Sequence, residues 1–481
     1  PYEHYFDEIY YPDGANSYLT FGVPDPKHPD AYPYDKDENH VHPPAAKLFM
    51  ASFMEVWWGV QRYVLHNFNP APTSISTISW RWGSLVLGLV IVALTYRLTL
   101  GMFKNRFIAF LAAFFVCIDQ VEIVQCRIAM LDMYEAFWIM IGLVCTWRYI
   151  QEPGKDMKWA WWAAICFAFG VATKWSVMFA MIGALVAVFL LKDREDLNGR
   201  NPWIVRLIDT LKVFVMGVVL AVAVYLMCFI PLCRADKWNL DHTWTDFRFY
   251  HVQMWNFRHD PKQFHHRYLS SWWEWPLCYR PIWYIYHEEP SPNYSFMAHW
   301  PQEKWFQRVF ARSMEQSPQV KWVYGAICLG SPWTWLFFLL FLLVVSIRMA
   351  LSLFFLFSTG AYTRPPPTDP DARIAYDEWR ESWQKGDEKG LAFCVLAYLP
   401  QVLLWSMNPG FMFYMLPVVP LMCILTAHTV ADWREMAIGR VVMTIFIVVA
   451  VLWTVVYYPL LIGYPIPKPY FEACMLIRNW I

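Results

Sequence analysis

The chain has 481 residues, of which 57% are hydrophobic and only 16% are charged. A typical soluble domain has about 25% charged residues, so this composition indicates that lipid is the solvent for much of the chain. The formal net charge is zero, without the basic excess that is typical of nucleic-acid-binding proteins. The composition therefore predicts a membrane protein with no nucleic-acid partner.

Residues 1–78 precede the first membrane-length apolar run and are polar and rich in proline. The adjacent carboxylates Asp7 and Glu8 lie near their start, between aromatic residues. From Ala45 to Leu65 the apolar residues recur at helical spacing, which predicts an amphipathic helix on the membrane surface or on other helices. On sequence alone, the two acids fit solvated loop residues as well as they fit a catalytic pair.

Apolar runs follow that are long enough, or nearly so, to cross a bilayer, which takes about 20 residues as a helix. We expect an all-α polytopic membrane protein, in which the sequence does not sharply mark the ends of several spans. The predicted spans are Ser79–Thr99, Phe107–Ile123, Met133–Ile150, Trp159–Thr173, Trp175–Leu191, Val213–Cys233, Trp333–Phe357, Leu391–Trp405, Phe411–Ala431 and Val441–Leu461.

The spans fall into two groups, residues 79–233 and residues 333–481. Residues 234–332 separate them and are crowded with Trp, Tyr, His and Arg, which is too aromatic for a disordered linker. We expect an ordered loop with short helices, partly at the membrane interface, where Trp and Tyr are favoured. Residues 359–390 are Pro-rich and then charged, which is typical of a cytoplasmic loop.

Basic residues gather in the loops that follow the first, third and fifth predicted spans. Short loops rich in Lys and Arg lie on the cytoplasmic side, so these three loops are expected there. Because successive spans cross the membrane in alternate directions, the remaining loops are expected on the outer face. These hold residues 1–78, Arg127, Asp132, Lys174 and residues 234–332. The sequence thus predicts that the sparse charges of the outer side share a compartment with Asp7.

A charge at the end of a membrane span is costly, so it usually has a partner or a function. Arg127 and Asp132 fit either a functional pair or a structural ion pair. Lys174 fits either a ligand-binding residue or a side chain that extends to the lipid headgroups. His42, before two prolines, fits either a site residue or a histidine bonded to the backbone of a turn.

A series of motifs follows in order along the chain. The stretches are Phe6–Tyr11, His42-Pro43-Pro44 with Lys47, Gln125–Asp132, Ala172–Ser176, His266 with Ser270, Trp272–Pro276, Arg280–Tyr284, and Tyr414 with Leu416, Pro417 and Pro420. Together they resemble the successive motifs of the protein O-mannosyltransferase family, and the resemblance covers nearly the whole chain, although each motif alone is weak. Ala46 and Arg267 depart from the family pattern, which has Gly and Pro there.

The resemblance implies a C-type glycosyltransferase fold with about ten or eleven transmembrane helices and an ordered outer-face loop region. It implies transfer of mannose from a polyprenyl-phosphate-mannose lipid to Ser or Thr hydroxyls of translocated proteins. The short interval 234–332 has no room for the β-trefoil domain of eukaryotic members, which suggests a bacterial or archaeal type in the plasma membrane. The family also has a transmembrane helix ahead of the Asp–Glu pair, which we expect to precede residue 1.

The resemblance also assigns roles to residues. Asp7 is the expected general base of an inverting transfer, with Glu8 holding the acceptor, the sugar or a basic neighbour. A departing lipid phosphate needs cations aimed at its oxygens, and the forked Arg127 guanidinium is the first choice. The further candidates are Lys174, Arg280 and His266 for the donor phosphate, and His42, Asp132 and Trp275 as supporting residues.

The sequence leaves two other functions to be considered. A related enzyme of similar fold would move a polyprenyl-linked sugar to a lipid or a glycan. A transporter would have ionisable residues near span centres and repeated, broken helices, whereas the charges here lie at span ends. No cofactor is certain and a divalent metal is undecided, because Asp7, Glu8, His42 and Asp132 carry ligand atoms but do not form a metal motif. The sequence does not give the oligomeric state.

Overall fold

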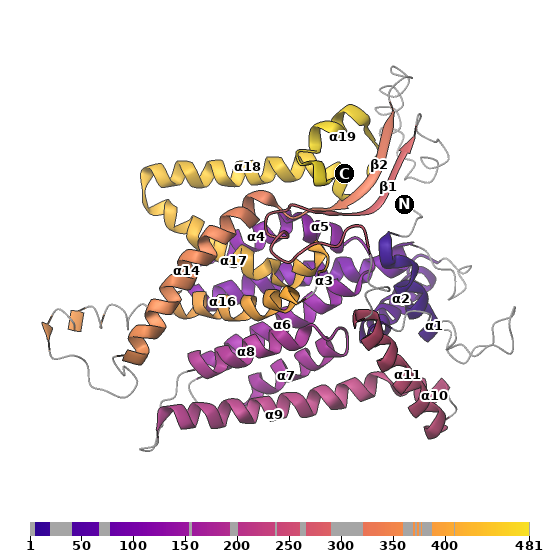
Figure 1. Ribbon diagram of the computed structural model, residues 1–481, viewed down its shortest axis with the longest axis horizontal. Helices are drawn as coiled ribbons and strands as arrows, with labels where there is room; N and C mark the ends of the chain where they lie inside the picture. The colour runs from indigo at the N-terminus through magenta and orange to yellow at the C-terminus, as the bar shows by residue number, and fades with distance from the viewer. Residues whose placement is uncertain are drawn as a thin grey trace, which may run out of the picture.

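The computed structural model describes residues 5–19, 41–66, 77–152, 156–192, 201–235, 238–259, 266–289, 321–358, 369–370, 373–374, 377, 387–407 and 409–480. Helices dominate this part of the chain, and the long ones lie side by side in a bundle (Figure 1). Most of the predicted cytoplasmic loop 359–390 lies outside the described residues.

Six described helical segments are long and apolar enough to cross a membrane, as expected for a multi-pass membrane protein. They contain α3, α9, α14, α16, α17 and α18, and α4, α7 and α8 are shorter apolar helices. The bundle helices are α3 (Thr77–Phe103), α4 (Arg106–Ile118), α6 (Leu131–Gln151), α7 (Lys158–Val171), α8 (Val177–Leu191), α9 (Pro202–Cys228), α14 (Pro332–Ser358), α16 (Asp387–Leu403), α17 (Val419–Asp432) and α18 (Ala437–Leu461).

One predicted span, Phe107–Ile123, is wrong as a single helix. Helix α4 ends at Ile118, and the short α5 (Gln120–Gln125) begins after Asp119. The Asp119 side chain accepts hydrogen bonds from the backbone N–H groups of Val121 and Glu122, at 3.0 and 3.3 Å, and so caps the new helix. This break directs the chain toward the loop that holds Arg127.

The predicted span Val213–Cys233 starts too late. Helix α9 begins at Pro202, with the Asn201 side chain accepting from the Trp203 N–H at 2.9 Å. The charged Arg206 therefore lies on the helix rather than in a loop. Its guanidinium donates to the carbonyl oxygens of Phe189 and Leu190 at the end of α8, which satisfies helix-terminal acceptors.

Smaller elements gather at one end of the bundle, on the right of Figure 1. The amphipathic helix predicted for Ala45–Leu65 is confirmed as α2, and it packs on α1 and α3. The other elements at or near this end are η1 (Phe6–Ile9), α1 (Tyr11–Leu19), α2 (Ala45–Tyr63), α10 (Ile230–Ala235), α11 (Leu240–His259), β1 (Ile282–Glu289), β2 (Trp322–Cys328), β3 (Ile466–Pro467), α19 (Lys468–Cys474) and η6 (Arg478–Trp480).

The described part of the interval 234–332 is ordered, as expected, but its structure differs from a set of short helices. Helix α11 has 20 residues. Strands β1 and β2 pair antiparallel, and β3 joins the other edge of β2, giving a three-stranded sheet in the order β1-β2-β3. A small sheet at the end of the bundle thus accompanies the predominantly helical fold.

Three short 3-10 helices complete the bundle. Helix η4 (Met412–Val418) takes the place of the first part of the predicted span Phe411–Ala431, and α17 continues from it. Pro417 and Pro420 lack the backbone N–H that α-helical hydrogen bonding requires, which accounts for this irregular start. The remaining two are η3 (Leu404–Ser406), directly after α16, and η5 (Trp433–Glu435), directly after α17.

Candidate active site

The Asp7–Glu8 pair lies in a strained turn at one end of the bundle. Phe6 starts η1 with φ +50°, a left-handed conformation that a bulky residue rarely adopts. Such strain costs about 1–3 kcal/mol. Ring contacts of the kind that surround Phe6 contribute about 0.5–1.5 kcal/mol each, so the packing around Phe6 offsets the strain of its backbone.

Four aromatic rings surround the Phe6 side chain, and we call them the Phe6 cage. They come from the loop before β1, from β1 itself and from the region of η4. Their ring centroids lie 5.5 Å (His266), 5.5 Å (Tyr284), 5.9 Å (Phe411) and 6.1 Å (Phe413) from that of Phe6. The cage thus joins the N-terminal turn to segments more than 250 residues away in the chain.

Glu8 is fully buried and its carboxylate is saturated with donors. Its oxygens accept from the backbone N–H groups of Ala129 and Tyr5, each at 2.8 Å. The Arg81 guanidinium on α3 forms an ion pair with Glu8, with Nε 2.7 Å from Oε1, and also lies over the Tyr5 ring. Of the three roles expected for Glu8, this geometry fits the contact with a basic neighbour.

The Asp7 side chain is only half-buried, unlike that of Glu8. Tyr11, at the start of α1, lies within hydrogen-bonding reach of its carboxylate. Burial and the nearby Asp132 carboxylate raise the pKa of Asp7 to about 7, although Lys174 and Tyr11 act in the opposite direction. A carboxylate with such a pKa is well matched to accept a proton near neutral pH.

Lys174 is buried in the turn between α7 and α8, with its ammonium group between two carboxylates of α6. Nζ lies 2.7 Å from Oδ1 of Asp132 and 3.1 Å from Oε2 of Glu135. The Ser176 hydroxyl donates to Glu135, and the ammonium lies 4.3 Å from the centre of the Tyr414 ring. Burial alone would lower the pKa of Lys174, but the two carboxylates outweigh it and keep the amine charged.

This arrangement corrects the partner that the sequence suggested for Asp132. Asp132 pairs with Lys174 and not with Arg127, so the structural ion pair considered for Arg127 and Asp132 is wrong. Within the described residues, no hydrogen bond or ion pair engages the Arg127 side chain, which is exposed after α5. The backbone beside it is fixed, because the Ala129 N–H donates to Glu8. Arg127 is thus a cation free to meet an anionic ligand.

Two further phosphate candidates lie in the loop before β1. His266 is a wall of the Phe6 cage, and burial together with Arg267 lowers its pKa, which leaves the ring neutral at pH 7. Arg280 is exposed, and its guanidinium donates to the carbonyl oxygen of Arg267 at 2.6 Å. Among the described residues, neither has a contact with the group around Lys174.

Trp275, expected as a supporting residue, is fully buried and belongs to the core. Its indole N–H donates to the Ser270 hydroxyl at 2.9 Å, and its ring packs on Trp405 and Tyr414. Ser270 in turn exchanges backbone hydrogen bonds with Gly410, both 3.0 Å long. Trp275 therefore supports the position of Tyr414 over Lys174.

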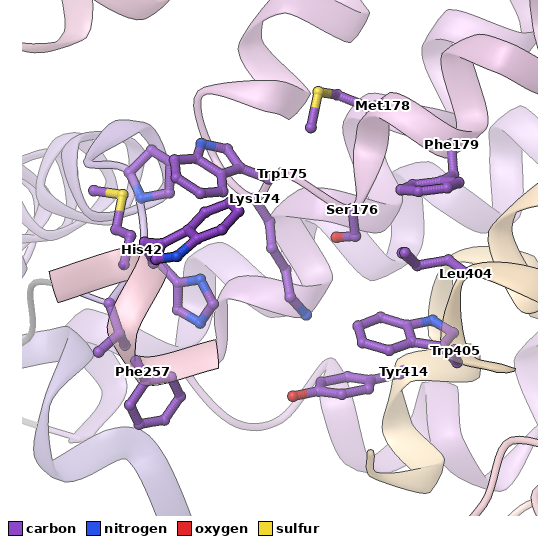
Figure 2. Close-up of a pocket in the computed structure, with 14 residues that line it drawn as sticks. His42, Lys174, Trp175, Ser176, Met178, Phe179, Phe257, Leu404, Trp405 and Tyr414 are labelled. Atoms are coloured by element: carbon purple, nitrogen blue, oxygen red, sulfur yellow. The ribbon is translucent and has the colours of Figure 1, made fainter. Parts of the chain in front are cut away.

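A mostly apolar cavity of about 190 Å³ adjoins Lys174. In Figure 2 the Lys174 ammonium points toward the space between His42, Trp405 and Tyr414. The Ala45 N–H donates to the carbonyl oxygen of Ala172 at 3.1 Å, which docks the His42 loop beside Lys174. The remaining lining residues are Val41, Pro43, Trp175, Ser176, Met178, Phe179, Met254, Trp255, Phe257 and Leu404.

The sequence analysis did not identify three residues whose side chains form part of this site. Glu135 could have been found, because it lies three residues after Asp132 and so on the same face of a helix. Arg81 carried only the weak signal of a cation at the start of a span, and Tyr11 carried none. No group of three or more His, Cys, Asp or Glu side chains in the described part of the chain could hold a metal ion.

Comparison with known proteins links this geometry to a family. Residues 21–233 match the family model described as dolichyl-phosphate-mannose-protein mannosyltransferase. The polyprenol-phosphate-mannose–protein mannosyltransferase of Mycolicibacterium smegmatis is 21% identical over 297 residues, covering 53% of this chain and 54% of that protein. Its counterpart in Mycobacterium tuberculosis is 22% identical over 294 residues, covering 51% and 52%. The chain thus spans about half the length of the curated relatives it matches.

The solved structure of the S. cerevisiae protein O-mannosyltransferase Pmt1-Pmt2 complex bound to the sugar donor matches with a TM-score of 0.66. The match covers 99% of this chain and 89% of that chain. At 12% identity it shows that the two chains share a fold. The fold is that of a C-type membrane glycosyltransferase, which confirms the fold class predicted from the sequence. Within that class, the stretch that matches a family model, residues 21–233, is similar to the dolichyl-phosphate-mannose-protein mannosyltransferases.

Proposed function

We propose that the chain transfers mannose from a polyprenyl-phosphate-mannose lipid to Ser or Thr hydroxyls of polypeptides. The observation that carries the proposal is the half-buried Asp7 carboxylate, with a pKa of about 7, beside the charged group around Lys174. The donor and the protein acceptor are those of the mycobacterial polyprenol-phosphate-mannose–protein mannosyltransferases that the chain resembles, and the geometry of the site is compatible with both.

In the proposed reaction, Asp7 accepts the proton of the acceptor hydroxyl as its oxygen bonds to the anomeric carbon of mannose. The bond from that carbon to the phosphate oxygen breaks, and polyprenyl phosphate leaves with the electron pair. Attack from the side opposite the leaving group inverts the anomeric carbon. The products are O-mannosyl polypeptide, polyprenyl phosphate and the proton on Asp7.

The leaving phosphate requires positive charge near its oxygens. Arg127 is the main candidate, because its guanidinium is exposed and has no protein partner among the described residues. Lys174 contributes a positive charge at the cavity, but two carboxylates already engage its ammonium. We assign Arg280 and His266 a smaller part, since one is bonded to a backbone oxygen and the other is neutral and packed on Phe6.

The apolar cavity beside Lys174 suits the first isoprene units of the donor. Its lining includes Trp255, Phe179 and Leu404, which offer apolar faces next to the ammonium group of Lys174. A lipid with a charged phosphate and a hydrocarbon tail needs that combination of neighbours. We place this site on the outer face of the membrane, following the loop charges.

The test uses the purified chain in detergent with polyprenyl-phosphate-mannose and a Ser/Thr-rich peptide, comparing wild type with Asp7→Asn. Mannosyl peptide from the wild type and only a small residual rate from the variant is the expected result. Mannose on a lipid or glycan acceptor, with no mannosyl peptide, would replace the protein acceptor and keep the base. Full activity of Asp7→Asn would remove Asp7 from the mechanism.

A further inference from the structure

We propose that Phe6 is a positioning residue, held by the Phe6 cage, that fixes the direction of the Asp7 carboxylate for the transfer reaction. The inference rests on the proposed function, because it concerns the base of that reaction. It adds a role for residues 266, 284, 411 and 413 that is separate from donor binding.

Phe6, Asp7 and Glu8 place three consecutive side chains in different surroundings. The Phe6 ring packs among four aromatic rings, and the Glu8 carboxylate is buried against Arg81 and the Ala129 N–H. Both neighbours of Asp7 are thus anchored in protein. Asp7 is the middle residue, and its half-buried side chain lies near Asp132, Lys174 and Tyr11.

The backbone conformation explains why an anchor is needed. A left-handed φ of +50° at Phe6 is unfavourable for any residue with a side chain and would relax if nothing held it. The Tyr5 N–H donates to the Glu8 carboxylate and the Glu8 N–H donates to the Tyr5 carbonyl oxygen, so these bonds close the turn around Phe6 without holding its ring. The cage adds that restraint, because moving the Phe6 backbone would pull its ring out of contact with all four neighbours.

The cage also connects the base to other parts of the site. Tyr284 is in β1, where its hydroxyl accepts from the Gln125 side chain at 2.6 Å, two residues before Arg127. Phe411 directly precedes η4 and Phe413 lies in it, and Tyr414 of the same helix covers Lys174 and packs against Phe413 with ring centroids 4.9 Å apart. The Phe6 ring is therefore held by elements that also position two of the cations.

The principal test measures steady-state transfer to peptide by Phe6→Ala, with Ile9→Ala as the control. Ile9 ends the same turn but is 48% exposed and outside the cage. Phe6→Ala is expected to lower kcat about 100-fold, as misplacement of a catalytic group by about 1 Å does, with the donor KM unchanged. Ile9→Ala is expected to keep the wild-type kcat.

A pair of variants separates strain from anchoring. Glycine adopts a left-handed φ without a penalty, so Phe6→Gly removes the ring and relieves the strain together. The proposal expects Phe6→Gly to lose as much kcat as Phe6→Ala. A wild-type kcat in Phe6→Gly would overturn it, because the turn would then need only a permissive backbone.

Two further measurements guard against a folding defect. Phe413→Leu removes one wall of the cage while keeping an apolar side chain, and a smaller fall in kcat is expected with an unchanged melting temperature. In an Asp7→Asn background, Phe6→Ala is expected to add no further loss, because both changes remove the same aligned base. Additive losses would contradict the proposal.

The outcomes also separate this inference from the function on which it rests. No transfer by the wild type to peptide would reject the proposed function. Transfer by the wild type together with an equal kcat for Phe6→Ala would reject only the positioning role.

Discussion

The Nζ atom of Lys174 lies 2.7 Å from Oδ1 of Asp132, although 42 residues separate them in the chain. Both side chains are more than nine-tenths buried, and Glu135 is the second carboxylate on the same ammonium. One cation thus compensates two buried carboxylates beside the cavity.

Replacing Lys174 should therefore affect stability as well as transfer. Lys174→Met leaves two carboxylates without their cation, and breaking a buried pair costs about 3–5 kcal/mol. We expect a lower melting temperature in detergent and no mannosyl peptide. The double variant Lys174→Met with Asp132→Asn should regain part of the stability but none of the transfer. Wild-type transfer by this double variant would show that the ammonium has no part in the reaction.

Replacing Arg127, unlike replacing Lys174, should lower transfer without lowering stability. Because its side chain is exposed and unpaired among the described residues, Arg127→Ala should change the unfolding free energy by less than about 0.5 kcal/mol. Loss of a donor to a charged leaving group should lower transfer about 100-fold or more. Peptide mannosylation and thermal unfolding measure the two effects, with the exposed Arg62→Ala as the control. Unchanged transfer in Arg127→Ala would assign the phosphate to another cation.

The Arg81–Glu8 pair should be chiefly structural. Arg81→Ala leaves the fully buried Glu8 carboxylate without its cation and should destabilise the protein by about 3–5 kcal/mol. Glu8→Gln keeps an oxygen for one of the backbone N–H groups, so its effect should be smaller. Thermal unfolding of both variants checks this order. A larger loss for Glu8→Gln would contradict it.

The pH dependence of transfer should report the ionisation of Asp7. Only the ionised carboxylate accepts a proton, so kcat/KM should rise with pH through about 7, following the raised pKa of the free enzyme. The measurement is kcat/KM for peptide from pH 5 to pH 9 at constant ionic strength. A rate that is level from pH 5 upward would mean that a group of lower pKa is the base.

The same ionisation has a consequence for stability. The pKa of Asp7 in the folded protein lies above the value of about 3.9 expected for an unfolded chain. Between about pH 4 and pH 7 the folded protein therefore binds more protons than the unfolded chain. The stability that comes from protonation of Asp7 is lost as the pH rises through that interval. Asp7→Asn removes the ionisation, so the variant should gain melting temperature relative to the wild type at pH 8 more than at pH 5.

Much of the architecture was predictable because membrane-length apolar runs are local properties of the sequence. Helices α3, α6, α8, α14 and α18 agree with the predicted spans to within a few residues. The break at Asp119 was missed, because a single polar residue in an apolar run does not reveal that its side chain caps a new helix. The sheet was missed because its strands are far apart in sequence.

The sequence by itself predicted that certain charges share one face of the membrane, since loop parity and the position of basic residues depend only on chain order. It thereby grouped Asp7, Asp132 and Lys174 before any contact was known. Only the tertiary structure decided their partners, giving Asp132 to Lys174 and Glu8 to Arg81 while leaving Arg127 exposed. The physical reason is that pairing of buried charges depends on the lateral packing and rotation of helices, which the order of residues along one chain does not specify.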